Sequence, residues 1–185
     1  MMEYYELIAD PLISNPIQIQ HIDVATYKDK ATWAEFKMAP KMTVGYFDNA
    51  PQVEIYDLLA RPTFLVSDSL KRLFALYNPY MQFKGIRVYA NDLEDDEAPL
   101  YWWPFIPSIE CLSDQTTKYP TGMLEHLVLD SCTLHNESIF RIAGILENKI
   151  VISLALAESM IRRKMTGFTL GPICFAEPFD SKRNH

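Results

Sequence analysis

The side chains that could carry out chemistry are few and lie far apart in the chain. Cys132 and His135 have the spacing of a metal-ligand pair, but a second close pair is missing and only His126 lies nearby. A structural cysteine and a surface histidine are therefore the simpler interpretation. The sequence has no phosphate-binding loop, zinc-protease, hydrolase or EF-hand motif. We expect no cofactor, no metal and no catalytic residues.

A run of carboxylates lies between positions 91 and 98. It consists of Asp92, Glu94, Asp95, Asp96 and Glu97. Hard cations such as Ca²⁺ bind several oxygens, but this run lacks the glycine and the spacing of a calcium loop. The first interpretation is a solvated acidic loop, and the second is an electrostatic contact for a basic partner.

An aromatic stretch follows the acidic run. Its rings are Tyr101, Trp102, Trp103 and Phe105, and Pro104 and Pro107 interrupt it. Because proline is excluded from helix interiors and central strands, we expect an edge strand or an irregular segment. Half of the rings in a strand would face outward. Two interpretations remain open, namely packing in the core and contact with a partner.

The elements around these residues include a unit that occurs twice, at 63–89 and 149–175. Each copy begins with a short apolar strand and continues with a serine, Ser67 or Ser153, at the N-cap position of an amphipathic helix. A glycine and a closing strand follow. An internal duplication is one explanation of this similarity between the two segments, and chance in a small protein is the other.

These patterns predict an α+β fold with a mixed, largely antiparallel sheet that contains two strand–helix–strand units. The segments 139–146 and 150–153 are expected to form a hairpin. The length of 185 residues suggests a single domain, 1–185. If the chain has lobes, they would be 1–90 and 99–178, joined by the acidic loop 91–98.

Composition limits the classes of partner. The formal net charge of -7 disfavours nucleic acid and suits a basic protein partner. No apolar run is long enough for a membrane span, and the acidic N-terminus does not resemble a signal peptide. The widely spaced Cys111, Cys132 and Cys174 favour free thiols in a reducing cytoplasm.

The strand–serine–helix pattern resembles an immunity-protein family of bacterial polymorphic toxin systems. This is the eleventh such family, formerly a domain of unknown function. The matching segments are Arg61–Ser67, Ile139–Ile142, Ile150–Ser153, Thr166–Phe168 and Gly171–Ile173. They cover about the C-terminal two thirds of the chain. The resemblance implies a protein that binds and neutralises a cognate toxin and is not an enzyme.

Three functions therefore remain to be compared. The first is a cytoplasmic toxin inhibitor whose acidic run and aromatic stretch contact a cognate toxin. The second is an enzyme acting on small molecules, in which His126 or His135 and a carboxylate act as acid and base. The third is a structural or regulatory homodimer.

Overall fold

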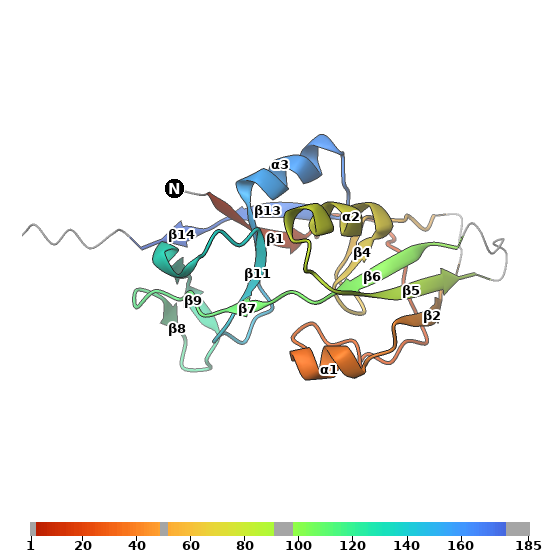
Figure 1. Ribbon diagram of the computed structural model, residues 1–185, viewed down its shortest axis with the longest axis horizontal. Helices are drawn as coiled ribbons and strands as arrows, with labels where there is room; N and C mark the ends of the chain where they lie inside the picture. Colours follow the sequence, from red (N-terminus) through yellow and green to blue (C-terminus); the bar gives the residue numbers. More distant parts are fainter. Residues whose placement is uncertain (1–2, 49–51, 91–97, 177–185) are drawn as a thin grey trace, which may run out of the picture.

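The computed structural model describes residues 3–48, 52–90 and 98–176, which form an α+β fold with mixed, largely antiparallel sheets, as the sequence predicts (Figure 1). The helices are α1 (Trp33–Met38), α2 (Asp68–Tyr77) and α3 (Leu154–Arg162), with a 3-10 turn, η1 (Ser131–Thr133). The strands are β1 (Tyr4–Ala9), β2 (Met42–Tyr46), β3 (Leu58–Leu59), β4 (Leu65–Ser67), β5 (Phe83–Tyr89), β6 (Leu100–Pro104), β7 (Ser108–Ile109), β8 (Thr117–Lys118), β9 (Leu124–His126), β10 (Val128–Leu129), β11 (Ile139–Ile142), β12 (Ile150–Ser153), β13 (Phe168–Pro172) and β14 (Cys174–Phe175). None of the described helices combines the length and the apolar character needed to cross a membrane.

The first sheet is assembled around the N-terminal strand. Its strands lie in the order β13-β1-β12-β11-β7. β1 is antiparallel to both neighbours, so that Tyr4 lies opposite Ser153 and Tyr5 lies opposite Pro172. β11 and β12 form the expected antiparallel hairpin, and β7 adds a parallel edge strand next to β11.

The second sheet has the order β2-β5-β6-β4-β3, with the aromatic strand β6 at its centre. This corrects the expectation that two prolines keep the aromatic stretch at an edge. Pro104 is the last residue of β6, opposite Phe83, so its missing N–H falls where the strand ends. The next residue, Phe105, donates its N–H to the Gln82 carbonyl at 2.9 Å, and pairing continues past the proline.

The two predicted strand–helix–strand units share one topology. In each, an antiparallel hairpin (β3–β4 or β11–β12) leads into a helix (α2 or α3) and then into a strand (β5 or β13) that is separated from the hairpin by one other strand of the sheet. β6 fills the position between in one sheet, and β1 fills it in the other. Ser67 lies opposite Tyr101, and Ser153 lies opposite Tyr4. The equivalence therefore extends to the register of the filling strand.

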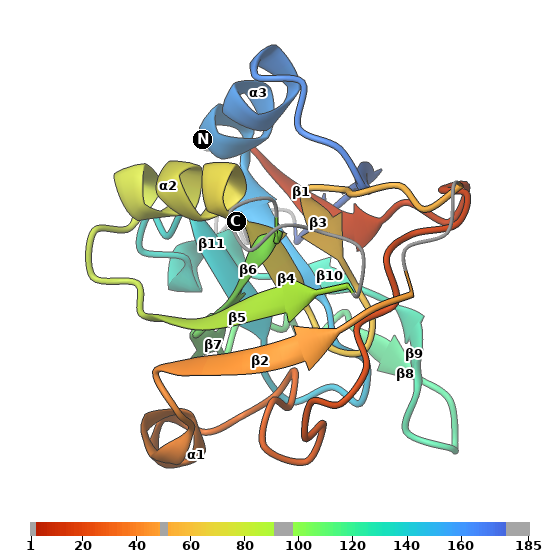
Figure 2. The ribbon, with the colours of Figure 1, turned by 90° about the vertical axis from the view of Figure 1, so that its right-hand side faces the viewer.

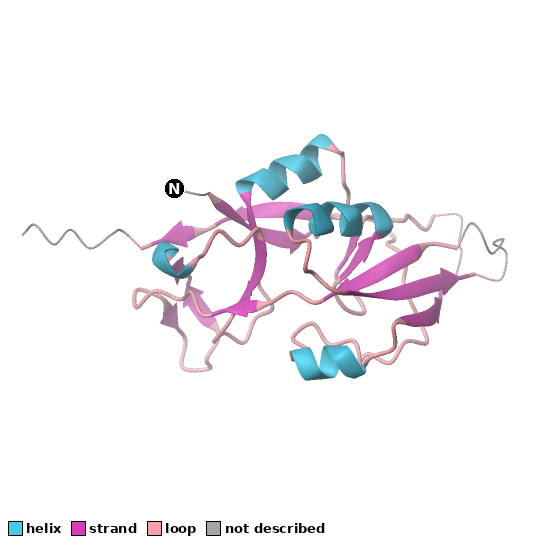
Figure 3. Ribbon diagram, viewed as in Figure 1, coloured by secondary structure: helices cyan, strands magenta, loops and turns pink. Residues whose placement is uncertain are grey.

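Both helices begin as the sequence predicts. The Ser67 hydroxyl accepts the Leu70 N–H at 3.1 Å, and the Ser153 hydroxyl accepts the Leu156 N–H at 3.4 Å. α2 and α3 lie side by side (Figures 1 and 2), and Tyr77 of α2 donates its hydroxyl to the Ala155 carbonyl of α3 at 2.8 Å. In Figure 3 these helices lie on one side of the strands and α1 lies on the other.

Three apolar cores follow from this layout. The central core joins α2 and α3 to residues of both sheets, among them Leu7, Val66 and Ile152. The second core lies under α1 and includes Phe36 and Trp103. The third includes Phe140, Val151 and Leu129 on the other face of the first sheet. Because β1 pairs in the first sheet, β6 pairs in the second, and one core joins them, the sheets do not follow a division into lobes at 91–98.

Candidate protein-binding surface

The residues predicted from the sequence to contact a partner have different surroundings in the structure. Asp92, Glu94, Asp95, Asp96 and Glu97 lie outside the described residues. Tyr101 and Trp103 are 1% and 2% exposed, which corrects their assignment to a binding surface. Both face the second core because they alternate with Trp102 along β6. Tyr101 also donates its hydroxyl to the Tyr56 carbonyl at 2.8 Å, and burial raises the pKa of its phenol.

Trp102 lies on the opposite face of β6 and is half-buried. Its indole N–H donates to a carboxylate oxygen of Asp68 at 3.1 Å. The ammonium of Lys71 lies 4.0 Å from the centre of its ring, a cation–π distance. Side chains of α2 thus already engage both the polar edge and one face of this indole, which leaves less of it for a partner.

Phe105 extends the aromatic row to the surface, where it meets α1. The ring centres of Trp33 and Phe105 are 4.9 Å apart in an edge-on arrangement, and Phe36 lies 5.3 Å from Phe105. Lys37 places its ammonium 5.9 Å from the Trp33 ring. Trp33 is 46% exposed. We refer to Trp33, Lys37 and Phe105 as the α1 surface.

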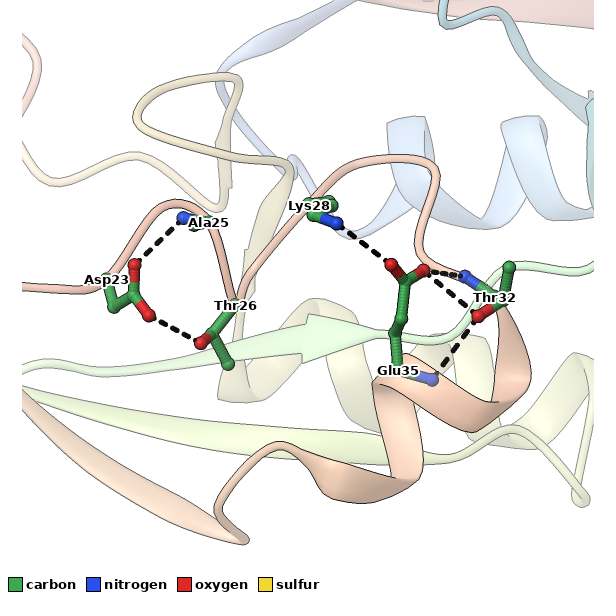
Figure 4. Close-up of polar contacts among 6 residues, drawn as sticks. All are labelled: Asp23, Ala25, Thr26, Lys28, Thr32 and Glu35. Atoms are coloured by element: carbon green, nitrogen blue, oxygen red, sulfur yellow. Dashed lines mark hydrogen bonds and ion pairs between the residues drawn. The ribbon is translucent and has the colours of Figure 1, made fainter.

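Capping bonds fix the short helix that carries Trp33. The Thr32 hydroxyl accepts the Glu35 N–H at 3.3 Å, and the Glu35 carboxylate accepts the Thr32 N–H at 2.8 Å, which makes a capping box (Figure 4). Lys28 adds an ion pair to Glu35 at 2.8 Å. The bond from Lys28, followed by those from Thr32, lowers the pKa of the Glu35 carboxyl to about 2.

The loop that leads into α1 is fixed as well. Asp23 accepts bonds from the Ala25 N–H at 3.0 Å and the Thr26 hydroxyl at 2.6 Å, and these bonds close a tight turn (Figure 4). The hydroxyl bond from Thr26 and the backbone bond from Ala25 lower the pKa of the Asp23 carboxyl. At the other end of α1, Lys84 donates to the Ala39 carbonyl at 2.8 Å.

Asp29 and Lys30 attach the same segment to both sheets. Asp29 accepts the Phe64 N–H at 2.7 Å, next to β4. Lys30 donates to the carbonyls of Ile145 and Leu146 at 2.9 and 2.7 Å, in the turn between β11 and β12. Burial lowers the pKa of the Lys30 ammonium. These bonds tie the segment that leads into α1 to both sheets and restrain the position of Trp33.

The groups considered for catalysis or metal binding do not come together. His126 and His135 are exposed, and neither lines either of two hollows on the surface of the described residues. Within residues 3–48, 52–90 and 98–176, no group of three histidine, cysteine, aspartate or glutamate side chains is placed to hold a metal ion. Cys132 and Cys174 are exposed, while Cys111 is buried, which raises the pKa of its thiol to about 11.

The larger hollow has a volume of about 640 Å³, and Asp10 and Arg61 are its charged lining residues. The smaller hollow, of about 200 Å³, contains one carboxylate, Asp48. Both are lined by Pro16 and Gln18. The charged side chains of the two hollows can bind a ligand by electrostatic attraction.

Comparison with known proteins assigns no family. No family model matches the sequence, and no curated protein matches it.

Trp33 is the surface residue that the sequence did not single out. The sequence of residues 28–38 predicts a loop or a short helix that contains separate aromatic residues. Thr32 and Glu35 have the spacing of a capping box, and this signal could have placed the helix start immediately before Trp33. The sequence alone could not reveal that Phe105, seventy-two positions later than Trp33, packs against it.

Proposed function

We propose that this protein acts by binding another protein through the α1 surface. The observation that carries this proposal is Trp33, which is 46% exposed on a helix fixed by a capping box. Exposed tryptophans are enriched among the residues that dominate binding energy. A tryptophan that is already held in place loses little conformational entropy when a partner covers it.

Within this class, we infer an immunity-type role, in which the chain covers the active surface of a cognate bacterial toxin in the cytoplasm. This finer inference rests on the resemblance of Arg61–Ser67 and Ile150–Ser153 to the immunity family. The net charge of -7 supports a basic partner. The acidic run 92–97 joins β5 to β6 in the sequence and would add steering by charge.

The alternative of an enzyme acting on small molecules has less support. Its histidines, His126 and His135, are exposed and line neither hollow. A general acid and base need to lie within hydrogen-bond reach of one substrate, which calls for a shared site.

The test uses the protein encoded by the neighbouring gene as the binding partner, with affinity measured by isothermal titration calorimetry. Trp33→Ala is expected to weaken binding about thirtyfold, the loss typical of a hot-spot residue. Tyr80→Ala is the matched control, because Tyr80 is an aromatic residue that is 89% exposed and lies outside the α1 surface. Binding that Trp33→Ala and Phe105→Ala both leave unchanged would exclude this surface.

The immunity role has its own readout. Cells that express the neighbouring protein should survive when this chain is co-expressed and lose viability without it. Co-expression of Trp33→Ala should protect less well than co-expression of Tyr80→Ala. If growth is the same with and without this chain, the inhibitory role is contradicted even when binding is measured.

A further inference from the structure

The two hollows form one candidate binding region away from the α1 surface. They share Pro16 and Gln18, and we refer to them together as the Pro16 groove. The floor of the larger hollow includes the buried apolar side chains of Ile17, Ile19 and Leu59. Its volume of about 640 Å³ lies in the range of sites that enclose small molecules or a few side chains.

Backbone pairing keeps one wall of the groove in place. The N–H of Ile17 donates to the Glu54 carbonyl, and the N–H of Glu54 donates to the Asn15 carbonyl, both at 3.1 Å. Gln20 exchanges both of its backbone bonds with Tyr46, at 2.7 and 3.1 Å. The wall is therefore built before any ligand arrives, which lowers the entropic cost of binding.

The charged groups around the groove are mainly carboxylates. Asp10 lines the larger hollow and Asp48 lines the smaller one, while Glu54 lines neither and forms a backbone bridge with Pro16. Arg61 is the single cation among the residues that line the two hollows. The balance of charge is negative, in agreement with the whole chain.

Each carboxylate is oriented by a bond to one of its oxygens. Asp10 accepts the Leu12 N–H at 2.9 Å, and Asp48 accepts an amide N–H of Gln20 at 3.1 Å. Glu54 accepts the hydroxyl of Tyr56. The bond to Glu54 raises the pKa of the Tyr56 phenol, and the charges of Glu54 and Asp10 add to this effect.

We propose that the Pro16 groove binds an extended, arginine- or lysine-rich segment of the partner protein. The aliphatic parts of such side chains suit the apolar floor of Ile17, Ile19 and Leu59, while their cationic ends suit carboxylates at the rim. This inference rests on the proposed function, since it names the chemistry of a second contact made by the same partner. The groove and the α1 surface share no residue, so each can be removed separately.

The probe for the groove is a fluorescein-labelled peptide of eight residues that alternates arginine and serine, with a glutamate–serine peptide as the charge control. Binding to the full chain is followed by fluorescence anisotropy. The basic peptide is expected to bind and the acidic peptide is not. Asp10→Asn and Asp48→Asn should each weaken binding about threefold, the effect of removing one exposed charge pair.

Two further variants separate the groove from diffuse attraction to an acidic protein. Glu125→Gln removes an exposed carboxylate of β9 that lines neither hollow, and it should leave peptide affinity unchanged. Ala60→Trp fills the larger hollow from its wall without changing charge, and it should abolish binding. Equal weakening by Glu125→Gln, or full binding by Ala60→Trp, overturns the proposal.

The outcome for the groove is distinguishable from the outcome for the α1 surface. Trp33→Ala should leave affinity for the basic peptide unchanged while it weakens binding of the neighbouring protein. If the peptide does not bind and Trp33→Ala still weakens the partner complex, only the groove assignment fails. If the peptide binds as expected and the neighbouring protein does not, the groove stands and the identity of the proposed partner fails.

Discussion

At the scale of single residues, Arg141 is the least expected feature of the core. It is 3% exposed, on the face of β11 that meets the central core. Its Nε–H donates to the Asn148 side-chain carbonyl at 2.8 Å, while Nη2 has no partner among the described residues. Burial lowers the pKa of the guanidinium to about 10, partly offset by the charge of Asp29. A cation is therefore held in an environment that disfavours it.

This environment leads to opposite expectations for the stability of variants at Arg141 and at Asn148. Arg141→Met removes the buried charge and keeps most of the volume, so the free energy of unfolding should stay within about 1 kcal/mol of the native value or rise. Asn148→Ala leaves the charged guanidinium with one hydrogen bond fewer. It should lower the free energy of unfolding by about 1–3 kcal/mol. Urea unfolding of both variants measures the difference. A loss for Arg141→Met as large as that for Asn148→Ala would show that the cation stabilises the fold.

At the scale of elements, α1 depends on its cap, because a helix of six residues is too short to be stable by itself. Thr32→Ala removes the hydroxyl that accepts the Glu35 N–H and should cost about 1 kcal/mol of unfolding free energy. It should also weaken partner binding, since Trp33 would lose its fixed position. Thr117→Ala, at an exposed strand residue, is the control for both measurements. Unchanged thermal stability of Thr32→Ala would contradict this role of the cap.

The charge of Glu35 makes the same element sensitive to acid. Its folded pKa of about 2 lies below the ordinary value of 4.5, so the unfolded chain binds more protons between these values. The stabilising contribution is therefore present above about pH 4.5 and is lost as the pH falls toward 2. The difference in Tm between the native protein and Glu35→Gln should be measurable at pH 7 and vanish near pH 2. A difference that does not change with pH would rule out the charge as its origin.

The elements also show what the sequence could and could not predict. The helix starts at Ser67 and Ser153 and the β11–β12 hairpin depend on local signals, and they were predicted correctly. The central position of β6 was not predicted. A proline at the end of a strand costs much less than one in its middle, and the sequence does not show where the strand ends. For the candidate site, Phe105 was identified and Trp33 was missed, since their contact is long-range.

At the scale of the whole molecule, the arrangement of β1 and β6 relates the two halves. In the second sheet, β6 follows β5 along the chain and fills the position between β5 and β4. In the first sheet, the equivalent position between β13 and β12 is filled by β1, from the opposite end of the chain. A strand that would follow β13 in a simple repeat thus stands at the start of the sequence. No local pattern could predict this, because the pairing joins the two ends of the chain.

This arrangement predicts that β1 can be moved without loss of the fold. A circular permutant that begins at Leu12 and joins His185 to Met1 places β1 directly after β13 and β14, as β6 follows β5. We expect it to unfold cooperatively with a Tm within about 3 °C of the native protein, which corresponds to about 1 kcal/mol for a chain of this length. Circular dichroism during heating provides the measurement.

Deletion of residues 1–10 is the contrasting variant. It removes Tyr4 and Leu7 from two cores and leaves β12 and β13 without the strand between them. Each buried side chain contributes about 1.5–3 kcal/mol, so the shortened chain should lose cooperative unfolding. A synthetic peptide of residues 1–10 should restore it in trans, because the position between β12 and β13 accepts an antiparallel strand on both sides. Two outcomes would contradict the view that β1 has the role in the first sheet that β6 has in the second. In one, the shortened chain unfolds like the native protein. In the other, the permutant fails to fold although the peptide restores folding of the shortened chain.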